Sequence, residues 1–157
     1  MQAEPVPYME KTRLYYEAQG FEKPYRWAHN GSIPFTAPAR PISQSVLTLI
    51  TTATLDEREV TERREVMSAS LSSPPSRLFA NELAWDRNAT HLEDLNSYFP
   101  IDPLKALVAA GRIGKLAARF HCVPTEYSQR CTNEMDAPEI LSRCRKDGVD
   151  AVLLVPI

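Results

Sequence analysis

The sequence has no long hydrophobic run, few glycines and no large excess of charge of either sign. None of its apolar runs approaches the roughly 18 residues that a membrane-spanning helix needs. Residues 1–7 are polar and contain proline, so they lack the basic and then apolar pattern of a secretory signal peptide. We therefore expect a cytoplasmic protein that does not enter a membrane.

Charge and cysteine content exclude further classes. The formal net charge is -2, which gives no electrostatic reason to expect a nucleic-acid partner. The 3 cysteines form no Cys-x-x-Cys pair, and an odd number of thiols argues against a disulfide scaffold and for a reducing compartment. There is also no histidine spacing typical of a metal site and no glycine-rich phosphate loop. We assign no metal site and no cofactor site to this chain.

Proline is abundant where glycine is scarce, with 13 prolines against 5 glycines. Several of these prolines lie before residue 42, which predicts an extended N-terminal arm rather than a flexible linker. One helix is expected in it over residues 8–19, ended by Gly20, with Tyr15 and Tyr16 covering a core face. We therefore divide the chain into an arm at residues 1–44 and an α/β domain at residues 45–157, the N-terminal part of a longer domain.

Four apolar or β-branched runs predict strands. They lie at residues 45–54, 66–71, 118–123 and 150–157. Between and after them, helices are predicted from Asp102, a capping residue, to Gly111 and from Asp136, a second cap, to Gly148. Strands and helices at this spacing predict parallel crossovers. The expected fold class is α/β, a mostly parallel sheet with flanking helices in a Rossmann-like or flavodoxin-like three-layer arrangement, incomplete at the C-terminus.

The last of these strands has the composition of a buried, central parallel strand, because it is a short run of Val and Leu entered from a glycine turn. In open α/β sheets, ligands bind in the crevice outside the carboxyl ends of such strands. The sequence therefore stops where an active site would begin. We expect the loops after Thr54 and Val123 to face that site.

The densest polar cluster spans residues 85–96, with three carboxylates, one imidazole and two amides. A carboxylate close to a histidine can orient it as a general base. We therefore take His91 and Asp94 as candidate catalytic residues, in acid–base or orienting roles. The alternative is a polar loop whose Asp and Asn side chains form caps and turns.

A second group of candidates follows the carboxyl end of the strand predicted at residues 118–123. Tyr127, Ser128 and Gln129 lie there, and position makes them candidate substrate-binding residues that line a crevice. The alternative is a surface loop rich in hydrogen-bonding groups.

The remaining histidines and the cysteines are expected to be structural. His29 and His121 are isolated, Cys144 is predicted on the apolar face of a helix, and Cys131 in a loop. A catalytic pair of His121 with Cys122 is not expected, because neighbours on a strand point to opposite faces.

Three segments together resemble one known family. They are residues 83–100, with Thr-His-Leu-Glu-Asp-Leu-Asn; residues 111–130, with Pro-Thr-Glu-Tyr-Ser-Gln-Arg; and residues 136–156, with Asp-Gly-Val-Asp-Ala-Val-Leu-Leu-Val-Pro. The chain is similar to the glycine, sarcosine, betaine and D-proline reductase family, selenoprotein B type, in its compact branch. Segments around Tyr15 and Pro24 fit that branch too, so the resemblance covers most of the chain.

The resemblance implies a nucleophile that this chain lacks. In that family the matching strand is followed at once by selenocysteine or cysteine, then by proline and a further cysteine. The chain would then be the N-terminal part of such a reductase, terminated at a UGA selenocysteine codon after Ile157 and inactive as it stands.

The chemistry implied by the resemblance is reductive cleavage of a C–N bond. A selenolate attacks the carbon next to a carboxylate and displaces an amine, or opens a proline ring. The implied partners are a small-molecule substrate, an amino acid or amine, and further reductase subunits, which bear pyruvoyl groups in characterised relatives. The alternative is a complete, non-catalytic α/β binding or assembly module, and either protein would form homo-oligomers through an exposed sheet edge.

Overall fold

A computed structural model describes residues 7–21, 23, 28–33, 36–57, 64–80, 91–123 and 128–157. Its internal contacts divide the chain into two units, Met1–Phe35 and Thr36–Ile157. Within the described ranges there is no helix with the length and hydropathy of a membrane span.

The described residues of the first unit form one helix, α1 (Tyr8–Ala18), at the predicted place. Arg13 pairs with Glu10 and Glu17 at 2.6 and 3.0 Å, spacings that stabilise an exposed helix. Gly20 follows at φ 89°, the left-handed conformation that ends helices. Within its own unit no residue of α1 is buried, and the expectation that its tyrosines cover a core face stays a prediction. Tyr16 contacts Tyr15 and Phe21 edge-on in the same unit.

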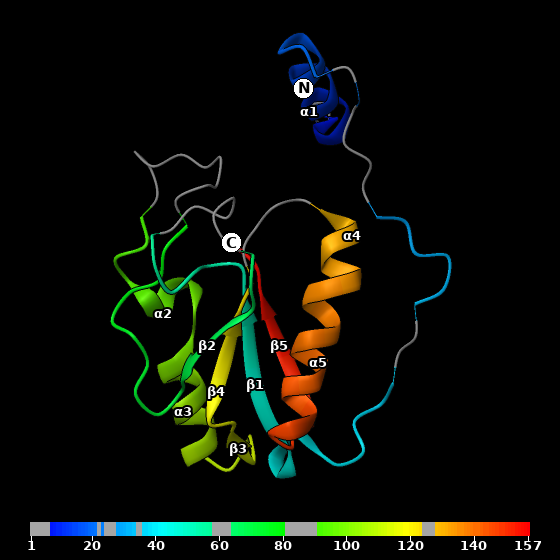
Figure 1. Cartoon of the computed structure of the whole chain (residues 1–157). Coiled ribbons are helices and arrows are strands. Elements are labelled where there is room, and N and C mark those ends of the chain that lie inside the picture. The colour runs from blue at the N-terminus through cyan, green and yellow to red at the C-terminus, as the bar shows by residue number, and fades with distance from the viewer. Residues whose placement is uncertain are drawn as a thin grey trace, which may run out of the picture. The chain divides into compact units, whose positions relative to one another are not determined.

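The second unit is an open α/β sheet with helices on both faces (Figure 1). Its elements in chain order are the 3₁₀ turn η1 (Ile42–Gln44), β1 (Val46–Thr51), β2 (Met67–Ser70), α2 (Leu95–Tyr98), α3 (Ile101–Ala109), β3 (Lys115–Leu116), β4 (Arg119–Cys122), α4 (Gln129–Cys131), the π-helical turn η2 (Thr132–Asp136), α5 (Ala137–Lys146) and β5 (Ala151–Val155).

The sheet is mixed and is organised around β1, which is parallel to β3, β4 and β5. β5 pairs with β1 from Leu47 to Thr51 and so occupies one whole edge of β1. The other edge of β1 is therefore shared by two strands, with β3 paired near the start of β1 and β4 near its end. β2 continues the sheet beyond β4 and is antiparallel to it. This arrangement confirms the predicted fold class of a mostly parallel sheet in three layers.

The alternation of side chains along the strands separates two cores. Leu47, Leu49 and Phe120 point toward α2 and α3, where they pack with Phe99 and Ile101 in the larger core. On the other face a smaller core joins α5 to the sheet. It consists of the buried residues Val66, Ile140 and Cys144, with Ile50, Val123 and Val149 packed against them.

β5 is parallel, as predicted, but it is not a buried central strand. Among the described strands it pairs with β1 alone, so its other edge is open. Its central residues are exposed, and Leu154 retains 68 % of its surface. The apolar composition identified a strand correctly, yet burial depends on what lies beside the strand, which composition does not encode.

The helix before β5 begins earlier than predicted. Ser128 caps it, because its side chain accepts a hydrogen bond from the backbone N–H of Cys131 at 3.2 Å. The helix then runs through α4, η2 and α5 without a break, so Asp136 lies inside it, at φ -69° and ψ -51°, and not at its cap. Cys131 is accordingly helical and buried, not in a loop. The wide π turn comes just before Pro138, which has no N–H to donate to the preceding turn.

α3 also begins before its predicted cap. Pro100 occupies the N-cap position and Asp102 lies in the first turn, where its carboxylate accepts a hydrogen bond from the Asn96 side chain at 2.8 Å. Ile101, the residue before Asp102, is buried in the larger core, and this burial explains why it belongs to the helix.

Candidate functional site

A pair of hydrogen bonds joins the carboxyl ends of β1 and β5. The Thr52 hydroxyl accepts from the backbone N–H of Ile157 at 2.9 Å and donates to the Ile157 backbone oxygen at 3.0 Å. The side chain of Ile157 packs against the larger core. Residue 157 is therefore held at the edge of the sheet where open α/β proteins bind their ligands.

The segment that carries Thr52 is itself fixed by hydrogen bonds. The Thr51 hydroxyl accepts from the backbone N–H of Ala53 at 3.1 Å, which stabilises the turn directly after β1. Two residues on, the backbone of Thr54 exchanges hydrogen bonds with Phe79 at 2.7 and 2.9 Å. Thr52 is thus presented by a defined turn between two anchored residues.

The helix capped by Ser128 starts at the same end of the sheet. In Figure 1, α4 lies near the end of the sheet where β1 and β5 finish, with α5 running back along the sheet. The first turn of a helix carries a partial positive charge and favours anions. Of the predicted substrate-binding residues, Ser128 supplies the cap and Gln129 is the exposed first residue of α4, while Tyr127 falls outside the described residues.

A buried ion pair holds the chain before β2 against this helix. Arg64 pairs with Asp136, and both side chains are largely removed from solvent, at 12 and 6 % exposure. Asp136 is the last residue of the π turn, a local helix geometry that often occurs at functional sites. The pair therefore joins the segment just before β2 to the helix that begins at Ser128, near the carboxyl ends of β1 and β5.

His91 and Asp94 lie on the approach to α2. Asp94 is the N-cap of that helix and accepts from the backbone N–H of Asn96 at 3.1 Å, while its own backbone oxygen accepts from the Ser97 hydroxyl at 2.7 Å. His91 is exposed, and its Nδ1 lies 3.4 Å from the backbone nitrogen of Glu93. The rest of the polar cluster, residues 85–90, falls outside the described residues. A catalytic role for these two residues stays a prediction.

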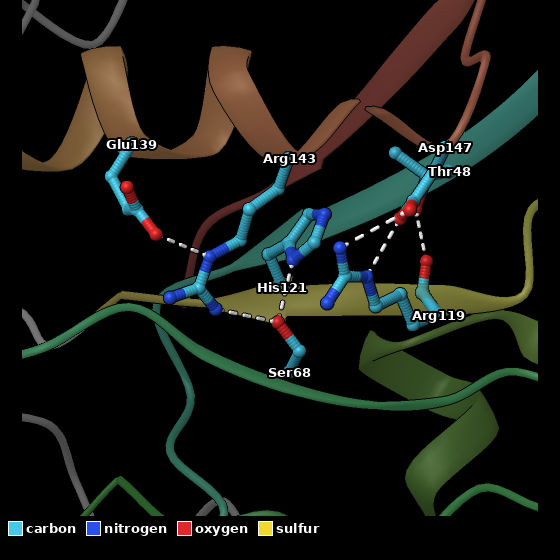
Figure 2. Close-up of polar contacts among 7 residues, drawn as sticks. All are labelled: Thr48, Ser68, Arg119, His121, Glu139, Arg143 and Asp147. Atoms are coloured by element: carbon cyan, nitrogen blue, oxygen red, sulfur yellow. Dashed lines mark hydrogen bonds and ion pairs between the residues drawn. The ribbon is translucent and has the colours of Figure 1, made fainter. Parts of the chain in front are cut away.

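A polar cluster that sequence reasoning missed lies between α5 and the sheet (Figure 2). At its centre the Ser68 hydroxyl lies 2.8 Å from Nδ1 of His121 and accepts a hydrogen bond from Arg143 at 2.8 Å. Arg143 also donates to Glu139 one turn earlier on α5, at 2.7 Å. One serine hydroxyl thus connects β2, β4 and the helix.

His121 is fully buried in this cluster. Burial lowers the pKa of His121 below its ordinary value of 6.5, and the nearby positive charges of Arg119 and Arg143 lower it further. The imidazole is therefore neutral at pH 7. Its Nε2 has no hydrogen-bond partner within the described part of the chain. The expectation of a structural histidine agrees with this burial, although only one ring nitrogen is paired.

The same face carries a second ion pair nearby. Arg119 binds Asp147 through two nitrogens, at 2.7 and 3.1 Å, and the Thr48 hydroxyl donates to the Arg119 backbone oxygen at 2.7 Å. The hydrogen bond from Arg119 lowers the pKa of Asp147 below its ordinary range. Together these contacts fix the last turn of α5 over the sheet (Figure 2).

The three cysteines are buried and do not form a reactive centre. His121 and Cys122 do point to opposite faces, as expected: His121 toward α5 and Cys122 into the larger core. Burial raises the pKa of Cys122 to about 12, so its thiol is not ionised near neutral pH. Among the residues that the structure describes, no three His, Cys, Asp or Glu side chains converge in a way that could hold a metal ion.

Comparison of the chain with protein-family models, with curated proteins and with solved structures finds no match.

Proposed function

We propose that this chain forms the N-terminal part of a selenocysteine- or cysteine-dependent reductase that cleaves a C–N bond, with its nucleophile directly after Ile157. The observation that carries the proposal is the hydrogen-bonded attachment of Ile157 to Thr52. This attachment supports the proposal that the next residue, at position 158, lies close to the carboxyl ends of β1 and β5, the place where open α/β proteins bind ligands. The resemblance of three segments to the selenoprotein B family supplies the identity of the group.

A helix start at the same end of the sheet would favour an anionic nucleophile placed close to its first turn. A helix of three linked segments begins at Ser128 at the same end of the sheet, and its first turn stabilises negative charge. A selenol or an activated thiol reacts as its anion, so this environment would increase the reactive fraction at neutral pH.

In the proposed reaction the selenolate or thiolate attacks the carbon next to a substrate carboxylate. A bond forms from that carbon to selenium or sulfur as its C–N bond breaks, and the amine leaves with the bonding electrons and takes up a proton. His91 or Asp94 would supply or relay that proton, and Tyr127, Ser128 and Gln129 would line the substrate crevice. Partner reductase subunits would complete the cycle.

The internal thiols do not offer a competing nucleophile. All three are buried, and the pKa of Cys122 is about 12. The burial of the three thiols agrees with the proposal that the nucleophile follows Ile157.

The exposed strand β5 favours a second candidate function, a non-catalytic assembly module. Its edge is unpaired among the described strands, and Val152, Leu153 and Leu154 are exposed along it. Such an edge can add a strand from another chain. This candidate requires no nucleophile.

Two experiments separate the candidates. In the gene, the reductase requires a UGA or cysteine codon directly after the Ile157 codon, followed by an open frame with a further cysteine; a UAA or UAG stop codon, or a codon for any other residue, overturns it. In the protein, the downstream frame is restored with cysteine at position 158, and serine at 158 is the matched control. The reductase predicts one rapidly alkylated thiol by mass spectrometry, absent in the serine protein. The assembly module predicts that the 157-residue chain already unfolds cooperatively as a defined oligomer that extension does not change.

A further inference from the structure

We infer that Thr52 is a positioning residue for the group at position 158, an inference that rests on the proposed function. Thr52 and Ile157 are 105 positions apart, yet one hydroxyl satisfies both backbone groups of Ile157, at 2.9 and 3.0 Å. A hydroxyl that accepts from the N–H and donates to the backbone oxygen of one residue restrains the backbone conformation of that residue, and with it the direction in which the following residue leaves.

Nothing else in the described structure can take over this task by hydrogen bonding. The ladder between β1 and β5 ends at the pair of Thr51 and Val155. The next residue, Pro156, has no N–H with which to extend the ladder. Within the described ranges, residues 156 and 157 make no other hydrogen bond.

Among the described strands, none pairs with the outer edge of β5, and this makes the attachment of Ile157 more important. An edge strand whose last residues pair on one side frays easily. Ile157 packs its side chain against the larger core, which holds its depth, while the Thr52 hydroxyl holds its backbone. Without the hydroxyl, we expect residue 157 to stay near the core but lose its fixed backbone orientation.

The substitutions that test this are Thr52→Val, which keeps the shape and removes the hydroxyl, and Thr52→Ser, which keeps the hydroxyl. Thr48→Val is the matched control, since Thr48 lies on β1, the strand that leads into Thr52, and its hydroxyl donates to the backbone oxygen of Arg119 instead. The first readout uses the 157-residue chain and needs no nucleophile. Amide hydrogen exchange at Ile157 should accelerate about tenfold in Thr52→Val and return toward the original rate in Thr52→Ser. Equal Ile157 exchange in Thr52→Val and the unsubstituted chain overturns the inference, whatever follows residue 157.

The second readout uses the extended protein with cysteine at position 158. Thr52→Val should slow its alkylation and move the pH midpoint of alkylation up, toward the roughly 8.5 of an unperturbed thiol. Thr52→Ser should keep the original midpoint, and Thr48→Val should keep it even if it lowers stability. If Thr52→Val accelerates amide exchange at Ile157 but the cysteine at position 158 is unreactive in the extended protein and all its variants, the proposed reductase function is wrong while the attachment of Ile157 stands. If the cysteine reacts rapidly and Thr52→Val does not change its midpoint, Thr52 has no positioning role.

Discussion

Ser68 and His121 lie directly opposite each other on the antiparallel strands β2 and β4, and their side chains meet at 2.8 Å on the face covered by α5. The same serine hydroxyl accepts a hydrogen bond from Arg143. A helix and two strands that are distant in sequence therefore meet at one hydroxyl. Because His121 is fully buried, losing that hydroxyl would leave a ring nitrogen without a partner.

Ser68→Ala should therefore destabilise the fold by about 1–3 kcal/mol, the cost of an unsatisfied buried polar group. The matched control is Ser72→Ala, because Ser72 is exposed and its hydroxyl contacts only Ser70 among the described partners. That change should stay within about 0.5 kcal/mol. Urea unfolding monitored by circular dichroism measures both. Equal losses in the two proteins would show that the Ser68 contact is not stabilising.

Acidification should destabilise the protein through His121. Burial and the two nearby arginines depress the pKa of His121 in the folded state below 6.5. Below pH 6.5 the unfolded chain binds a proton that the folded chain excludes, so the free energy of unfolding falls as the pH falls. The slope is at most about 1.4 kcal/mol per pH unit, and the loss stops once the folded pKa is passed. Above pH 6.5 this contribution is constant.

Urea titrations between pH 5 and 8 test this slope. His121→Gln should flatten the dependence between pH 5 and 6.5, whereas substitution of the exposed His29 by Gln should preserve it. Asp147, whose pKa is lowered from 3.8 by Arg119, loses its contribution only at lower pH and does not interfere. An unchanged slope in His121→Gln would assign the acid sensitivity to other groups.

The strands and helices were predictable where local pattern determines them. The β-branched run of β1 and the apolar run that contains β4 identified strands, and Gly148, at φ 64°, ended α5 where expected. β3 was missed because it has only two residues and is defined by its pairing with β1. The start of the helix before β5 was misplaced because an aspartate followed two residues later by proline, as at Asp136, has the pattern of a helix cap. The chain is in fact already helical from Gln129.

The contacts of the candidate site were harder to predict because they join residues far apart in sequence. Thr52 is ordinary in its local context, and only the parallel pairing of β1 with β5 brings it to Ile157. The buried cluster did leave a local signal. Polar residues at alternate positions, Arg119 and His121 on β4 and Ser68 and Ser70 on β2, indicate a polar stripe on one face of the sheet. Which helix covers that stripe depends on topology.

The buried pair of Arg64 and Asp136 should contribute far more to stability than an exposed pair on the same helix. Asp136→Asn removes the carboxylate that pairs with Arg64 inside the fold, and we expect a loss of about 3–5 kcal/mol. Glu134→Gln is the control, since its pair with Arg130 is exposed and should be worth about 0.3–0.5 kcal/mol. Thermal and urea unfolding of the two proteins give the comparison. A loss below 1 kcal/mol for Asp136→Asn would mean that solvent reaches the pair.

The open edge of β5 predicts self-association of the 157-residue chain. Leu154 is the most exposed residue of the strand, at 68 %, and its apolar side chain lies beside a row of backbone groups that no other described strand pairs with. A lysine there places a charge on the edge, a common protection of natural edge strands. In sedimentation velocity, Leu154→Lys should shift the population toward monomer at equal concentration, with little change in unfolding midpoint. Leu107→Lys is the control, because Leu107 is exposed on α3, away from the edge, at 40 %. If both substitutions reduce association equally, general surface hydrophobicity is responsible; if neither does, the β5 edge does not mediate association of this chain.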